Sequence, residues 1–289
     1  MAEGRGDGGG TPTARRIVLG SQLRKLRERL EISRAAAGFE IRGSESKISR
    51  MELGRVSFKE RDVADLLTMY GVDDAQEREQ FLAMVKEANE PGWWHRYSDL
   101  MPNWFHDYVG LEESASRIQT CELQFVPGLM QTEDYSRALA THGRPDLSTP
   151  ETERRVTLRQ SRQKVLHRTD APKLWAVIDE SVLHRPIGGA RVLREQIDHL
   201  LELTRLPNIS LQIVPYSLSG YAAEGAFTML RFNEMELPNL VYIEHLGGAL
   251  YLDRPEEIER YSRVIDRLTV DADTPVKSRQ TLLKRRAEL

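Results

Sequence analysis

Apolar residues recur at helical spacing through the first third of the chain. Leu19, Leu23, Leu26 and Leu30 lie three or four positions apart, with Arg and Lys between them. This spacing predicts an amphipathic helix with one buried face. Four more helices are expected after it, each marked by a capping residue or by its own apolar stripe. They cover residues 33–40, 44–53, 57–70 and 74–89, so the pattern predicts an all-α, five-helix N-terminal domain.

Residues with special backbone or capping preferences mark the limits of these helices. Ser33 and Ser44 are good N-cap residues for the second and third helices, and Gly54 ends the third. Ser57 and Glu60 have the spacing of a capping box, which predicts the start of the fourth helix. Two short helices, a tight break and a third helix that starts with small polar residues are typical of a helix-turn-helix.

The character of the sequence changes after residue 90. Pro91-Gly92 ends the helical pattern, and an aromatic cluster follows between Trp93 and Tyr108. We therefore expect a domain boundary here, with a helix-turn-helix domain over 15–90 and a second domain over 91–289. Residues 1–14 are rich in Gly, Thr and Pro, which predicts a disordered tail.

The second domain mixes strand-like and helical segments. Short apolar runs predict strands, whereas longer periodic segments predict helices. The expected strands are 174–178, 209–214, 227–232, 240–245 and 249–252, and the expected helices are 111–124, 132–142, 150–168, 189–204, 255–270 and 275–287. This order predicts a mixed α/β domain with one sheet flanked by helices.

Charge is distributed unevenly along the 289 residues. The window 15–62 contains 13 Lys or Arg and 7 Asp or Glu, a charge of +6, while the whole chain has −3, so the remainder carries −9. A basic module on an acidic body is the electrostatic pattern of a protein that binds phosphate with one part. Solvated faces of small helical domains often carry the same surplus, so charge alone does not decide.

Composition narrows the cellular setting. The single cysteine, Cys121, excludes an intrachain disulfide and a cysteine-rich zinc site. The N-terminal residues lack the apolar stretch of a signal peptide, and no apolar run approaches the roughly 18 residues of a membrane helix. We expect a cytoplasmic protein, associated with the nucleoid when bound to DNA, and no membrane partner.

The third helix carries the chemistry expected of a recognition helix over 44–53. Lys donates to guanine O6 and N7, Glu accepts from cytosine N4, and small residues let the backbone approach the major groove. The candidate residues on this helix are Ser44, Glu45, Ser46, Lys47, Ser49 and Arg50. Arg34 and Arg55, on either side of it, are expected to contact phosphates. A helical bundle used for protein contact is the simpler alternative.

Three motifs within residues 17–72 fit a known pattern. They are Leu19-x3-Leu23-Arg-x-Leu26-Arg27, Ser44-x-Ser46-Lys-Ile-Ser-Arg-Met-Glu52 and Gly54-Arg55. This segment resembles the Cro/CI-like (XRE) helix-turn-helix family of transcription regulators. In that family the second helix usually starts with a Gln that touches the phosphate, where this chain has Arg34. Many members also have a turn glycine where this chain has Arg42, with Gly43 one residue later.

The second domain also resembles a known one. Its motifs are Trp93-Trp94, Trp104-Phe105-x2-Tyr108, Val126-Pro-Gly-Leu-Met-Gln-Thr132, Asp179-Glu180 and Val241-Tyr-Ile-Glu244. They resemble the domain that follows this helix-turn-helix in many actinobacterial regulators, often labelled antitoxin-like or developmental regulators. Their genes frequently lie beside one for a small partner protein, which this resemblance implies as a partner here. It implies no biochemical activity for the domain.

Two functions of different classes follow. The first is a sequence-specific, double-stranded-DNA-binding transcription regulator, expected to be a homodimer because one such module buries little DNA. The alternative is an antitoxin-like protein that binds a small partner, with DNA binding serving autoregulation.

An enzyme in the second domain is a third alternative, and the sequence gives it little support. The seven histidines have no metal-ligand spacing, and phosphate-loop, dinucleotide and nucleophile-elbow motifs are absent. We therefore expect no catalytic residues, no metal and no cofactor. Glu180 and Glu244 end predicted strands. There they either form the acidic floor of a ligand pocket, with Arg185, Tyr242 or His245 beside them, or they cap helices or form salt bridges. No ligand can be named.

Overall fold

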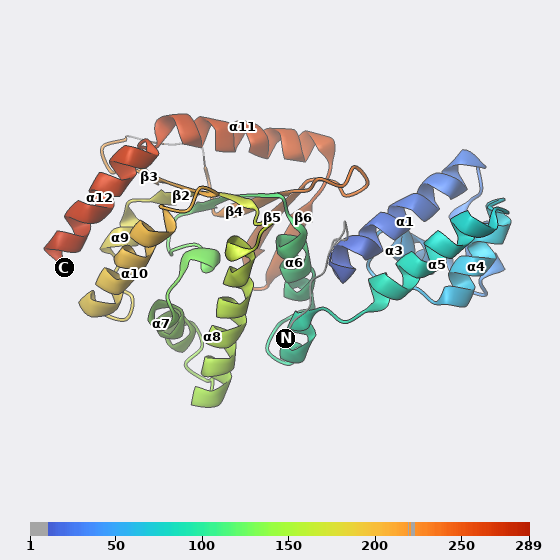
Figure 1. Ribbon diagram of the computed structural model, residues 1–289, viewed down its shortest axis with the longest axis horizontal. Coiled ribbons are helices and arrows are strands. Elements are labelled where there is room, and N and C mark those ends of the chain that lie inside the picture. Colours follow the sequence, from blue (N-terminus) through green and yellow to red (C-terminus); the bar gives the residue numbers. More distant parts are fainter. Residues whose placement is uncertain (1–10, 219, 221–222) are drawn as a thin grey trace. The chain divides into compact units, whose positions relative to one another are not determined.

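A computed structural model describes residues 11–218, 220 and 223–289. The chain divides into two compact units (Figure 1). The first unit contains the chain as far as His95, together with His106–Ser114 and Asn233–Leu237. The second contains Arg96–Phe105, Ala115–Phe232 and Pro238–Leu289. The sequence predicted a single boundary near residue 90, whereas the chain crosses between the units five times.

The five predicted helices of the first unit are present: α1 (Pro12–Arg29), α2 (Arg34–Glu40), α3 (Glu45–Glu52), α4 (Glu60–Met69) and α5 (Ala75–Asn89). Capping sets several of their starts, since Thr11, Ser33, Ser44 and Asp74 each accept a backbone N–H of the following turn. The prediction of a disordered tail is wrong for residues 11–14, because Thr11 caps α1 and Pro12 opens it. Residues 1–10 of that tail lie outside the described residues.

The capping box expected for α4 is also wrong. Lys59, not Ser57, occupies the N-cap position, and it makes no side-chain capping bond. Glu60 is the first helical residue instead of the third. The helix is held by its buried stripe, which includes Val63, Leu66 and Leu67. Tertiary packing thus replaces the local signal that the sequence offered.

Glycines let α1 lie directly against the end of α3. A Cβ on Gly20 of α1 would stand 2.3 Å from the carbonyl oxygen of Met51. Gly54, just after α3, has φ +65°, and a Cβ there would stand 2.6 Å from the backbone nitrogen of Ile17. Its N–H donates to Met51 O and that of Arg55 to Arg50 O, so Gly54 ends the helix as predicted. The position of α3 is therefore fixed by backbone contact with α1.

The second unit contains one six-stranded sheet in the order β3-β2-β1-β4-β5-β6. β1, β2 and β3 are parallel, whereas β4, β5 and β6 continue the sheet as antiparallel neighbours. The strands are β1 (Arg117–Glu122), β2 (Lys173–Asp179), β3 (Ile209–Val214), β4 (Phe227–Arg231), β5 (Leu240–His245) and β6 (Gly248–Leu252).

Helices flank this sheet on both faces. In Figure 1, α11 lies over one face, and α7, α8 and α10 lie on the other. Ile265 and Leu268 of α11 pack with Val177, Met229 and Val241 of the sheet in one buried cluster. The remaining helical segments are η1 (Trp93–Tyr97), α6 (Asn103–Ser114), η2 (Gly128–Met130), α7 (Glu133–Gly143), α8 (Thr149–Gln163), η3 (Lys164–His167), α9 (Ser181–His184), α10 (Ala190–Leu203), α11 (Pro255–Asp271) and α12 (Pro275–Glu288). The predicted fold class, an all-α domain followed by a mixed α/β domain with one flanked sheet, is confirmed.

One predicted helix is wrong. The segment 111–124 was expected to be helical, but α6 ends at Ser114 and β1 follows it at the centre of the sheet. Gln119 and Thr120 are buried in this strand, so its core-facing positions do not stand out as apolar. Gln119 accepts a hydrogen bond from Arg231, and the Thr120 hydroxyl lies 3.0 Å from that of Thr228.

Among the described helices, none has the length and apolar character to span a membrane.

Candidate nucleic-acid interface

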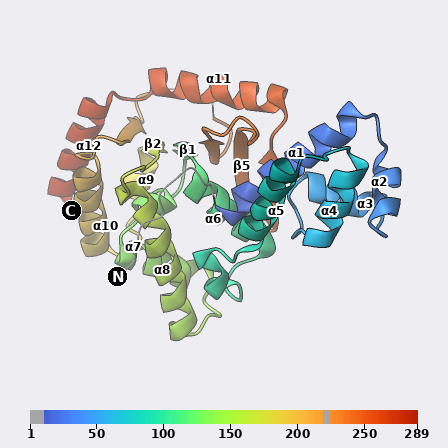
Figure 2. The same cartoon turned by 45° about the vertical axis from the view of Figure 1, so that its right-hand side comes forward.

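The turn between α2 and α3 is tight. Gly38 of α2 is buried, and a Cβ there would lie 2.9 Å from the carbonyl carbon of Ser44, so α2 packs directly on the start of α3. Ser44 Oγ accepts the N–H of Lys47 at 3.2 Å and caps α3. Ile48 and Met51 face the core. The opposite side of α3 therefore faces away from that core. Figure 2 shows α2 and α3 side by side in the first unit.

Most of the predicted site residues lie on this outward side. Ser44, Glu45, Ser46 and Arg50 are exposed, and Ser49 is half-buried. Arg55 is exposed just after the helix. Within the described part of the chain, the side chains of Glu45, Arg50 and Arg55 make no hydrogen bond or ion pair, which leaves their polar groups available to a ligand. The structure thus brings together on one surface most of the residues predicted to contact DNA.

Arg34 belongs to an ion-pair cluster with a buried carboxylate. Its Nε donates to Glu52 Oε2 at 2.9 Å, while Arg27 of α1 donates to both oxygens of Glu52, at 2.5 and 3.1 Å. The Glu52 side chain is only 3% exposed, and Arg34 is 36% exposed. These bonds to Glu52 hold the pKa of Arg27 above its ordinary value. Arg34 is therefore held by one edge of its guanidinium.

Lys47 lies differently from the other predicted residues. Its Nζ donates to Asp62 Oδ2 of α4 at 2.5 Å, and the Asp62 side chain is 2% exposed. A Cβ on Gly43 would lie 2.9 Å from Cδ of Lys47, so the lysine stem crosses the turn on its way to α4. The ammonium that was expected to reach base edges is bound within the protein.

Arg42 is a candidate residue that the sequence analysis did not include in the site. It has φ +51°, in the left-handed region that costs an L-residue about 1–2 kcal/mol. Its side chain is exposed and makes no hydrogen bond or ion pair within the described residues. The sequence could have indicated this residue, since Arg42 stands where many members of the Cro/CI-like family have a turn glycine. A left-handed backbone at an arginine next to α3 makes Arg42 a candidate for a role that uses its charge.

We expect Arg42→Gly to leave the chain as stable as the parent, or to stabilise it by up to about 1 kcal/mol. Relief of the left-handed strain outweighs or balances the added freedom of glycine in the unfolded chain. The same variant should bind duplex DNA more weakly, with a salt dependence flatter by about one unit. Urea denaturation and DNA titration check the two effects. An affinity equal to that of the parent would exclude Arg42 from the interface.

Three carboxylates of the second unit, Glu122, Glu180 and Glu244, lie at the C-terminal ends of β1, β2 and β5, which are on the same side of the sheet. Glu180 Oε2 accepts the N–H of Tyr216 at 2.7 Å, and Glu244 Oε2 accepts the Tyr242 hydroxyl at 3.0 Å. Burial, and then the charge of Glu244, raise the pKa of Glu122 to about 7. These acceptor bonds are local, and neither is one of the helix caps or salt bridges expected for Glu180 and Glu244, so the choice between a ligand pocket and a structural role stays a prediction. Among the described residues, no group of acidic, histidine or cysteine side chains has the arrangement of a metal site.

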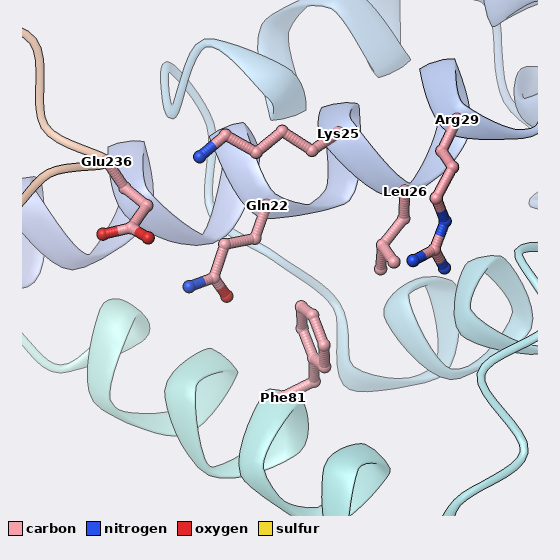
Figure 3. A pocket seen from close by; sticks show the side chains of 6 residues that line it. All are labelled: Gln22, Lys25, Leu26, Arg29, Phe81 and Glu236. Atoms are coloured by element: carbon pink, nitrogen blue, oxygen red, sulfur yellow. The ribbon is translucent and has the colours of Figure 1, made fainter.

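A shallow groove lies between α1 and α5 in the first unit (Figure 3). Leu26 and Phe81 form its apolar part, and its volume of about 240 Å³ is below the range of ordinary ligand pockets. The polar residues at its margin, Gln22, Lys25, Arg29 and Glu236, point in different directions. We assign no ligand to this groove.

Comparison with known proteins assigns both parts of the chain. Residues 18–81 match the family described as "Helix-turn-helix domain", a range that includes α2, α3 and the turn between them. Residues 105–284 match the family described as "Domain of unknown function (DUF5753)". No curated protein and no solved structure matches the chain. Because the second match covers more than half of its length, the chain belongs to the DUF5753 family, and it carries a helix-turn-helix domain ahead of the domain that defines that family.

Proposed function

We propose that the protein is a sequence-specific, duplex-DNA-binding transcription regulator of the XRE type. The observation that carries the proposal is the outward side of α3, where Glu45 and Arg50 stand exposed without a partner among the described residues. Three arginines surround this helix: Arg34 before it, Arg42 in the turn and Arg55 after it. A short polar helix edged by cations is the geometry of a module that enters the major groove between two phosphate backbones.

In this proposal Arg34 and Arg55 bind phosphates of the duplex. Glu52 takes only the Nε of Arg34, so the two terminal nitrogens of that guanidinium keep their donors for a phosphate. The carboxylate also fixes the direction of the side chain, which reduces the rotational entropy lost on binding. Arg55 follows Gly54 at the C-terminal end of α3 and is free to contact a phosphate there. Such contacts set the position of α3 on the duplex without reading its sequence.

Side chains of the first turns of α3 contact the base edges in this proposal. Glu45 is an acceptor-only group, and among base edges of the major groove it is suited to the N4 amino group of cytosine. Ser46 and Ser49 are short enough to let the helix backbone approach, and they both donate and accept. Arg50 lies further along and reaches either a guanine edge or a phosphate.

We expect Arg34→Met and Arg55→Met each to weaken binding to all duplexes. Each removes one phosphate contact, so the plot of log affinity against log salt should flatten by about 0.9. Fluorescence anisotropy of a labelled duplex, titrated at several salt concentrations, measures affinity and slope together.

Arg263→Met is the matched control. Arg263 lies on α11 of the second unit and forms an exposed ion pair with Glu259, so its loss changes the net charge equally. Its slope should equal that of the parent. If the parent chain binds no duplex at low salt, or if Arg34→Met and Arg55→Met both keep the parent slope, the proposed interface is wrong.

The remaining predictions of the sequence analysis belong to the same proposal. A homodimer would present two α3 helices to two half-sites, and sedimentation of the full chain measures that state. The antitoxin-like alternative, with a small protein partner and DNA binding as autoregulation, stays a prediction about the second unit. We propose no catalytic activity, and a regulator of this kind would act in the cytoplasm on nucleoid DNA.

A further inference from the structure

We propose that Asp62 is a specificity-determining residue, because it holds Lys47 on the protein and so excludes this lysine from the DNA groove. The inference rests on the proposed function and concerns which residues of α3 read the bases. Lys47 is the third residue of α3 and, from its side-chain type alone, is the strongest guanine reader of the first turn. The structure gives its ammonium another role.

Two contacts and the burial of the side chain define the tether. The Nζ of Lys47 lies 2.5 Å from Asp62 Oδ2, within charge-assisted hydrogen-bond distance. The stem of the lysine lies over Gly43, where a Cβ would come within 2.9 Å of Cδ. The side chain of Lys47 is 30% exposed, so most of it is covered by the protein. The side chain therefore extends across the turn toward α4, and its ammonium does not project into solvent from the first turn of α3.

Asp62 makes the tether strong, because it is nearly inaccessible to water. Its side chain is 2% exposed, and the next cation, Arg61, approaches Oδ1 only to 3.9 Å. If Lys47 swung toward a base, this carboxylate would stay buried without a close countercharge. Breaking a buried pair in that way costs more free energy than one base contact returns. Lys47 therefore stays on Asp62 when DNA binds.

The consequence for recognition is a change of sign at the first turn of α3. With Lys47 withdrawn, Glu45 is the charged side chain that this turn presents to the groove. A carboxylate there repels phosphates and accepts from cytosine, so it opposes binding to arbitrary sequences. We therefore expect the operator to carry a cytosine opposite Glu45 and no guanine contact from Lys47.

The test compares base preferences of full-length variants in a selection from a randomised duplex library. Lys47→Met keeps the apolar stem and loses only the ammonium, so its selected sequence and salt slope should equal those of the parent. Glu45→Gln, on the same turn, is the matched control and should shift one position from cytosine toward adenine. A change of preference at any position in Lys47→Met would overturn the inference.

Asp62→Asn tests the tether from the other side. It frees the lysine, so affinity for random duplex should rise several-fold and the salt slope should steepen by about one unit. Because a single change in this pair leaves one partner unmatched and risks unfolding, the double variant Lys47→Met/Asp62→Asn is included. It has neither charge, and it should keep the parent's selected sequence; loss of that sequence in a folded double variant contradicts the inference.

Unfolding measurements keep the inference independent of DNA. Urea denaturation of the parent, the two single variants and the double variant forms a thermodynamic cycle. We expect strong coupling, with the double variant more stable than the sum of the single losses predicts. Additive losses would show that the pair is not a tether, whether or not the chain binds DNA. Strong coupling in a chain that selects no sequence would instead remove the proposed function and leave the tether as a purely structural pair.

Discussion

Replacing Glu52 with Gln is expected to destabilise the first unit by about 3–5 kcal/mol, because it removes the carboxylate from a buried ion pair. Arg27 is 8% exposed, and Glu52 is its deepest countercharge. The single amide oxygen of Gln accepts hydrogen bonds from a guanidinium less strongly than a carboxylate oxygen does. The NH₂ group of Gln would point a donor at a guanidinium that also donates. Arg27 would keep its bond to the carbonyl of Ile32, at 2.7 Å, and its contact with the half-exposed Glu28, at 3.4 Å, but it would lose its only deeply buried countercharge among the described residues.

The effect should reach the proposed DNA interface as well. Glu52 ends α3, and its second oxygen holds Arg34 at the start of α2, so both helices of the helix-turn-helix depend on it. Urea denaturation followed by circular dichroism measures the stability. Glu45→Gln is the matched control, since it makes the same change at an exposed site on the same helix, and it should stay within about 0.5 kcal/mol of the parent. A loss below about 1 kcal/mol for Glu52→Gln would mean that Arg27 finds another partner.

A fragment that ends at Glu90 is expected to be less stable than one that ends at Ser114 by about 3–5 kcal/mol. In the whole chain the first turn of α1 is bonded to α6: Thr11 N–H donates to Ser114 Oγ at 2.8 Å, and Thr11 Oγ1 donates to Gly110 O at 2.6 Å. Each bond contributes about 1 kcal/mol. Trp94, 2% exposed, lies against Gly110, and burial of such a side chain adds about 1.5–3 kcal/mol.

The shorter fragment lacks all of these contacts, and α1 should fray at its start. With a urea dependence of about 1 kcal/mol per molar for a domain of this size, the two midpoints should differ by about 3–5 M. Gly110→Leu in the whole chain is an independent check, because a Cβ there would lie 2.4 Å from Thr13 Oγ1. Equal midpoints for the two fragments, with an unperturbed Gly110→Leu, would show that α6 contributes nothing to the first unit.

Local signals in the sequence account for much of the fold, and the errors occur where long-range contacts decide. Ser33, Ser44 and Gly54 predicted helix limits because capping involves residues only a few positions apart. β1 was taken for a helix because Gln119 and Thr120, which are polar, are buried through bonds to β4. The partners of those bonds lie more than 100 residues away, at Arg231 and Thr228, and no periodicity within residues 111–124 reveals them.

The candidate site shows the same division. Position along α3 was enough to predict that Glu45, Ser46 and Arg50 are exposed, since the inward positions were marked by Ile48 and Met51. The partners of Lys47 and Arg34 were beyond sequence reasoning, because Asp62 and Glu52 are 15 and 18 positions away and on other helices. A residue's type suggests what it can bind, whereas the fold decides whether the group is free to do so.

The division of the chain between its two units also sets an order of events during synthesis. The first unit takes its last residues from Asn233–Leu237, and β1 meets β4 only after Phe227 has been made. Helices α1 to α5 can form while most of the chain is still untranslated, because their contacts are local. The unit that carries the helix-turn-helix is nevertheless complete only when residue 237 has left the ribosome. On a nascent chain the helix-turn-helix can therefore form well before Asn233–Leu237, the last residues of its unit, are available to join it.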